Sequence, residues 1–110
     1  MENNEKTIVA IATPIGSAGV GIVRLSGEKS LAIAKKMFNK SIEQPRYMYL
    51  GKIKTDKLEE HGIVVYFKAP HSYTGEDVVE FQVHGGIMFV NEIVKQCLHL
   101  GATMAERGEF

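Results

Sequence analysis

The sequence predicts an α+β domain: a mixed β-sheet with helices packed against it. Short runs of β-branched and aromatic residues recur along the chain, which is typical of strands. Two longer segments, 28–38 and 87–100, instead carry apolar residues at helical spacing. The predicted order is strand, strand, helix, strand, strand, strand, helix and a possible final strand, which suits an α+β architecture.

Length and composition indicate one domain, residues 1–110, with no repeat or internal linker. The 45% hydrophobic and 24% charged content is typical of a soluble globular protein, and the sequence shows no membrane span or secretory signal. Thirteen basic residues balance thirteen acidic ones, which does not suggest an autonomous nucleic-acid binder. A single cysteine, Cys97, excludes an internal disulfide and suits a reducing, cytoplasmic compartment.

Two strands are predicted at the N-terminus. Residues 7–13, TIVAIAT, are apolar and rich in β-branched side chains, which predicts a strand covered on both faces. Proline and glycines at 14–19 predict a turn, and residues 20–26 resume as a strand. Arg24 interrupts the apolar residues of that second strand.

The first helix is predicted over residues 28–38, with Ser26 placed as its N-cap. The basic pair Lys35 and Lys36 lies late in this segment, where the helix dipole favours positive charge. Its apolar residues at helical spacing are Leu31, Ala34, Met37 and Phe38.

The middle of the chain predicts three strands. Residues 47–53 and 62–70 are two of them, joined by a charged connection at 54–61 that contributes nothing to a core. The third, residues 77–84, alternates between two faces. Val79, Phe81 and Val83 share one face, and Glu80, Gln82 and His84 share the other.

The second helix follows Gly85 and Gly86 and is predicted over residues 87–100, with Gly101 as its stop signal. Residues 103–105 predict a possible last strand. The apolar stripe expected to face the core is Ile87, Val90, Val94, Cys97 and Leu98.

The glycine-rich segment GSAGVG, residues 16–21, has GxxGxG spacing and joins two strands, so it is interpreted as a turn and not a dinucleotide-binding loop. No GxxxxGK[ST] motif occurs, and this chain alone is not expected to hydrolyse nucleoside triphosphates.

The sequence gives little evidence for metal-dependent or nucleophilic catalysis. The histidines at 61, 71, 84 and 99 lack ligand spacing, so no metal site is predicted; a small metal-dependent hydrolase is the weakest alternative. No catalytic residue is predicted, and Cys97 is expected to be a buried hydrophobic residue.

Arg24 and Glu80 are the candidate binding residues. One interpretation is a solvated sheet face, or an ion pair between the two side chains. The other is a ligand site, because a carboxylate can accept a pair of adjacent N–H donors, as on a guanine or pterin ring. An arginine nearby offers a planar fork for a carbonyl or carboxylate of the same ligand.

Four sequence blocks resemble the N-terminal domain of the tRNA modification GTPase MnmE, or TrmE, family. They are TIVAIATPIGSAGVGIVRLSG, PRYMYLGKI, APHSYTGEDVVEFQVHGG and ERGEF, which occur in the family's order and spacing from residue 7 onward. The resemblance implies a fold similar to the tetrahydrofolate-binding domains of the glycine-cleavage T-protein group. It also implies a cytoplasmic protein without membrane attachment, and a longer chain with a helical domain and a G domain that binds GTP, Mg and K.

The implied function is tRNA wobble-uridine modification together with the flavin-dependent partner MnmG (GidA). This domain is then expected to mediate homodimerisation and to bind 5-formyltetrahydrofolate or methylenetetrahydrofolate as the one-carbon donor. The family's folate contacts fall on positions occupied here by Arg24 and Glu80. A further contact, a lysine, lies downstream of GEF, so the 110-residue chain is expected to bind folate weakly. The alternative is an assembly-only dimerisation module without a working folate site.

Overall fold

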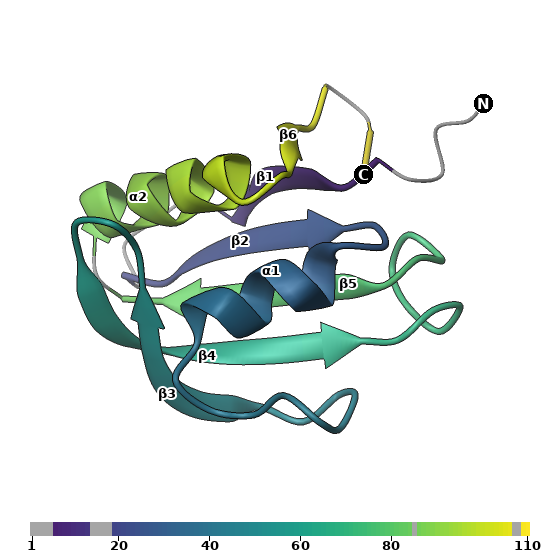
Figure 1. Cartoon of the computed structure of the whole chain (residues 1–110), viewed down its shortest axis with the longest axis horizontal. Coiled ribbons are helices and arrows are strands. Elements are labelled where there is room, and N and C mark those ends of the chain that lie inside the picture. The colour runs from purple at the N-terminus through teal and green to yellow at the C-terminus, as the bar shows by residue number, and fades with distance from the viewer. Residues whose placement is uncertain (1–5, 14–18, 85, 107–108) are drawn as a thin grey trace.

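A computed structural model describes residues 6–13, 19–84, 86–106 and 109–110. The order of its elements confirms the predicted α+β class (Figure 1). The elements are β1 (Ile8–Thr13), β2 (Gly21–Ser26), α1 (Ser30–Met37), β3 (Tyr49–Lys54), β4 (Glu59–Phe67), β5 (Val78–Val83), α2 (Gly86–His99) and β6 (Thr103–Met104). Residues 14–18 of the predicted turn, which include the first three residues of GSAGVG, lie outside the described residues.

The described strands form one mixed sheet in the order β3-β4-β5-β2-β1-β6. All neighbours are antiparallel except β1 and β6, which run parallel. The short β6 confirms the possible final strand. It pairs with β1, so the first and last strands of the described residues lie side by side.

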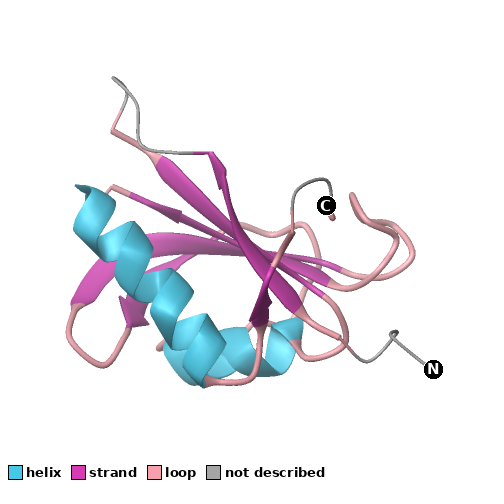
Figure 2. Cartoon of the chain, turned by 90° about the horizontal axis from the view of Figure 1, so that it is seen from above, coloured by secondary structure: helices cyan, strands magenta, loops and turns pink. Residues whose placement is uncertain are grey.

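Both helices cover the same face of the sheet (Figure 2). Val23 and Leu25 of β2 and Phe81 of β5 are fully buried against them. The helices also meet each other, since Cys97 Sγ of α2 lies 3.9 Å from Met37 Sδ of α1. Because side chains alternate along a strand, the intervening residues of β2 and β5 face the opposite, helix-free side.

The helix-facing residues differ from the prediction for α2. Val90, Val94 and Cys97 are buried as predicted, but Ile87 and Leu98 are 59% and 36% exposed. Phe89 and Ile93 are buried instead. The segment is apolar on several sides, so its helical period alone could not select the face that packs on the sheet.

Ser26 is not the N-cap of the first helix. It is the last residue of β2, where its hydroxyl lies 2.7 Å from Thr74 Oγ1. The next residue, Gly27, donates its N–H to Asp77 O, so backbone pairing extends one residue beyond the strand. The helix begins only at Ser30, and Thr7 Oγ1 accepts the N–H of Lys29. Thr7, which directly precedes β1, thus supplies a side-chain acceptor near the helix N-terminus, the role that was assigned to Ser26.

The first strand is covered less completely than predicted. Ile8 and Val9 are buried, whereas Ile11 is 37% exposed and Ala12 is also exposed. Only the two-residue strand β6 lies outside β1 in the described sheet, so the far half of β1 lacks a neighbour on that side.

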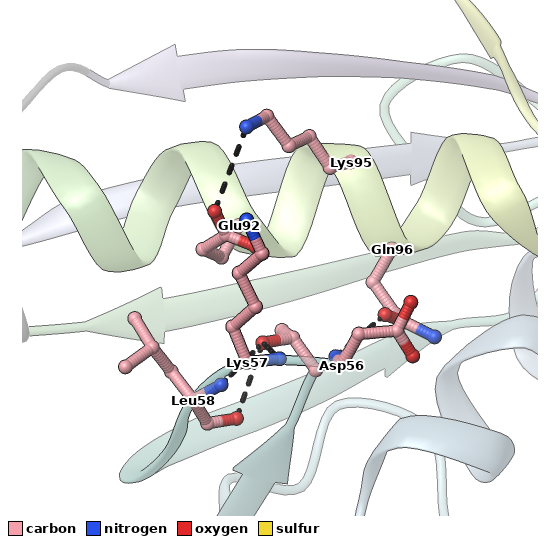
Figure 3. A network of polar contacts seen from close by, with 7 residues as sticks. Asp56, Lys57, Leu58, Glu92, Lys95 and Gln96 are labelled. Atoms are coloured by element: carbon pink, nitrogen blue, oxygen red, sulfur yellow. Dashed lines mark hydrogen bonds and ion pairs between the residues drawn. The ribbon is translucent and has the colours of Figure 1, made fainter.

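The charged connection is shorter than predicted, because residues 59–61 belong to β4. The prediction that it contributes nothing to the core is wrong, because Leu58 packs against the core. A tight turn at 55–58 closes the β3–β4 hairpin, with Thr55 buried and its Oγ1 accepting the Leu58 N–H at 3.0 Å. The Asp56 N–H donates to Gln96 Oε1 of α2 at 2.8 Å (Figure 3). The turn is therefore tied to the helix layer.

Among the described residues, no helix combines the length and apolar character needed to span a membrane.

Candidate functional site

Arg24 and Glu80 lie directly opposite each other on the neighbouring strands β2 and β5. Their strand neighbours Val23, Leu25 and Phe81 point to the helices and are fully buried. Arg24 and Glu80 therefore project from the opposite face of the sheet. The structure brings together the two residues that the sequence singled out.

The two side chains form an ion pair. Arg24 Nε and Nη2 donate to the same oxygen, Glu80 Oε2, at 2.9 and 2.6 Å. The pair is partly shielded from water, with side-chain exposures of 21% for Arg24 and 14% for Glu80. Among the described residues, the second oxygen, Oε1, has a single long contact, 3.5 Å from Gln82 Nε2. This oxygen keeps most of its capacity to accept hydrogen bonds.

A cavity of about 220 Å³ opens beside the ion pair. We call it the pair cavity; it is lined by Arg24, Arg46, Phe67, Ser72, Tyr73, Val78 and Glu80. Tyr73 is 73% exposed, and the centroid of its ring lies 5.0 Å from Arg24 Cζ. The cavity thus combines a carboxylate, a guanidinium and aromatic rings, the groups that bind a flat polar heterocycle.

The rim of the pair cavity is a loop between β4 and β5 that is anchored at both ends. Asp77 Oδ1 accepts the Ala69 N–H at 2.9 Å. The Tyr66 hydroxyl donates to the same oxygen at 3.5 Å. Burial, reinforced by the negative charge of Asp77, raises the pKa of Tyr66, which keeps the phenol a neutral donor. These bonds hold the loop that carries Tyr73 over Arg24.

Gln82 and His84 line a second and larger cavity, of about 340 Å³. We call it the apolar cavity; Val20, Leu50, Gly51, His61, Gly62 and Ile63 also line it. Gln82 connects the two cavities through its contact with Glu80. The pair cavity is the smaller of the two, but it is the one that contains charged donors and acceptors, so we assign the polar binding chemistry to it.

The histidines and Cys97 give no sign of a metal or nucleophilic site within the described part of the chain. Among the described residues, no group of three or more His, Cys, Asp or Glu side chains lies close enough together to hold a metal ion. Burial raises the pKa of Cys97 to about 12, which leaves its thiol protonated and a poor nucleophile.

The sequence reasoning missed Arg46, Phe67 and Tyr73. All three stand in or next to loops, where no periodic pattern reveals which side chains converge. The available signal was local: Tyr73 lies in the polar turn segment HSYTGED that leads directly into the strand of Glu80.

Comparison with known proteins gives concordant matches. The family described as "GTP-binding protein TrmE N-terminus" matches residues 7–110. A tRNA modification GTPase MnmE from Francisella tularensis subsp. novicida (strain U112) is 53% identical over 105 residues. One from Francisella philomiragia subsp. philomiragia is 50% identical over the same length. Each match covers 94% of this chain but only 23% of the relative's length.

Proposed function

Because the chain belongs to the family of TrmE N-terminal domains, we propose that it holds a reduced folate in the pair cavity. The observation that carries the proposal is the juxtaposition of Arg24 and Glu80 on one partly shielded sheet face. Glu80 would accept the amino group and the adjacent ring N–H of the pterin. The Tyr73 ring offers a surface on which the flat heterocycle stacks.

Binding requires an exchange of partners at Glu80. In the described structure two N–H groups of Arg24 occupy Oε2. A pterin edge presents the same kind of donor pair, so it can replace Arg24 without leaving the carboxylate unpaired. The released guanidinium can then donate to the pterin carbonyl, which keeps both charges satisfied.

The proposed ligand is 5-formyltetrahydrofolate or methylenetetrahydrofolate, which supplies a one-carbon unit for modification of the tRNA wobble uridine. The domain's own residues bind and orient this ligand and carry out no bond-breaking step. For the whole protein we propose a cytoplasmic tRNA modification GTPase that uses GTP, Mg and K and acts with MnmG (GidA).

Calorimetry with two ligands tests the proposal. 5-Formyltetrahydrofolate is expected to bind the 110-residue chain at a one-to-one ratio with weak affinity. An analogue that lacks the pterin 2-amino group should bind roughly tenfold more weakly, or worse, because it forfeits one charged hydrogen bond. Equal affinities for both ligands would remove the proposed contact with Glu80, and no binding of either at millimolar concentration would contradict the folate site.

We also propose that the chain forms a homodimer. The helix-free face of the sheet carries apolar side chains, among them Leu50, which is 65% exposed, beside the half-buried Ile63. Apolar surface of this kind is typical of interaction sites. Sedimentation equilibrium is expected to show a concentration-dependent dimer, and Leu50→Glu should shift it toward monomer. A dimer that binds no folate would favour an assembly-only module; a wild-type monomer at all concentrations would contradict dimerisation.

A further inference from the structure

Basic side chains gather next to the pair cavity. A further cavity of about 280 Å³ is lined by Pro45, Arg46, Lys68, Ala69 and His71, and we call it the basic cavity. Its charged lining residues, Arg46 and Lys68, are both cations, and no carboxylate lines it among the described residues. Arg46 lines the pair cavity as well, so one side chain borders both spaces.

Arg46 is held firmly in this position. Its backbone N–H donates to Tyr66 O at 2.7 Å, and its guanidinium carbon lies 5.4 Å from the centroid of the Phe67 ring. Its φ of 63° is in the left-handed region, which costs free energy for any residue other than glycine. The fold thus fixes the direction of an arginine at a strained backbone position beside the candidate site.

The charge of Arg46 is not neutralised by the contacts that hold it. Nη2 donates to a neutral acceptor, the His71 carbonyl oxygen, at 2.9 Å. Within the part of the chain that the structure describes, no carboxylate pairs with Arg46 or with Lys68. This contrasts with Arg24, whose charge is balanced by Glu80. A guanidinium carries several N–H donors and prefers a carboxylate as its bidentate partner, so Arg46 retains donors for an incoming anion.

We propose that Arg46 and Lys68 form a subsite for carboxylates at the end of the ligand opposite its heterocycle. This inference rests on the proposed function and extends it to the glutamate tail of the folate. With the pterin on Glu80 in the pair cavity, a ligand that continues past Arg46 reaches the basic cavity. Added glutamates then add negative charge beside a cavity that two cations line, so the subsite favours polyglutamylated folates.

The test compares three ligands that share one pterin: 5-formyltetrahydropteroate, 5-formyltetrahydrofolate and its triglutamate. The readout is the ratio of the triglutamate affinity to the pteroate affinity, measured by calorimetry on the 110-residue chain. We expect a ratio of roughly ten or more for the wild type, which decreases as salt is added. Arg46→Gln and Lys68→Gln should each bring the ratio toward one, while Lys40→Gln, which removes an exposed cation elsewhere, should not.

The outcomes separate this inference from the folate proposal. A wild-type ratio near one, with Glu80-dependent binding of all three ligands, overturns the subsite and leaves the folate site in place. Unchanged ratios in both variants overturn it as well, because Arg46 and Lys68 would then have only a structural role. Lys68→Gln keeps the test valid if Arg46→Gln fails to fold. Failure of all three ligands to bind overturns both proposals.

Discussion

Replacing Glu80 by Gln is expected to weaken binding of 5-formyltetrahydrofolate by roughly 30- to 1000-fold, or about 2 to 4 kcal/mol. The amide keeps the size of the side chain but loses its charge and one of its two acceptor oxygens. It also presents an NH₂ group that would face the N–H donors of the ligand. Calorimetry on the variant and the wild type measures the change.

Glu60→Gln is the matched control for this substitution. It removes the same charge from an exposed position on β4 of the same sheet, and its affinity should equal that of the wild type. The Glu80 variant also leaves the partly shielded Arg24 without its carboxylate, so a circular dichroism spectrum must first show that the fold is intact. A folded Glu80→Gln protein with wild-type affinity would remove Glu80 from the site.

Gly27→Ala is expected to lower the free energy of unfolding by more than about 3 kcal/mol. A Cβ at this position would lie 2.6 Å from Lys6 O and 2.7 Å from both Cα and Oγ1 of Thr7. Two of these atoms are backbone and cannot move without shifting the start of β1. The φ of 135° adds strain, because L side chains rarely adopt it.

Gly75→Ala separates the steric clash from the backbone strain. Its φ of 83° is also positive, but a Cβ there meets no atom within 4 Å. We expect a loss of about 1 to 2 kcal/mol from backbone strain alone. Urea unfolding measures the free energy of unfolding of both variants. Equal losses in the two variants would contradict the expected clash of a Cβ at Gly27 with Lys6 and Thr7.

Much of the fold could be predicted because strong local patterns specify it. The alternation from Val79 to Val83 identified the two faces of β5, and the structure buries one of them completely. The same alternation left Glu80 on the open face, and Arg24 stood out as the charged residue of an apolar strand. These two residues could be named from the sequence because each lies within a regular strand.

The features that could not be predicted from the sequence depend on tertiary packing. The sequence left open whether Arg24 and Glu80 pair with each other, and only the register of β2 against β5 shows that they do. Tyr73 and Arg46 reach the site from loops whose paths no periodicity specifies. Ser26 met the composition rule for an N-cap, but strand pairing through Gly27 continued past it and delayed the helix.

A crystal structure of the chain with bound 5-formyltetrahydrofolate would show whether Glu80 and Arg24 hold the pterin. We expect the pterin in the pair cavity, with its amino group and ring N–H at hydrogen-bond distance from Glu80 and with Arg24 moved away from Oε2. A ligand bound elsewhere, or bound while both Arg24 hydrogen bonds to Glu80 persist, would contradict it.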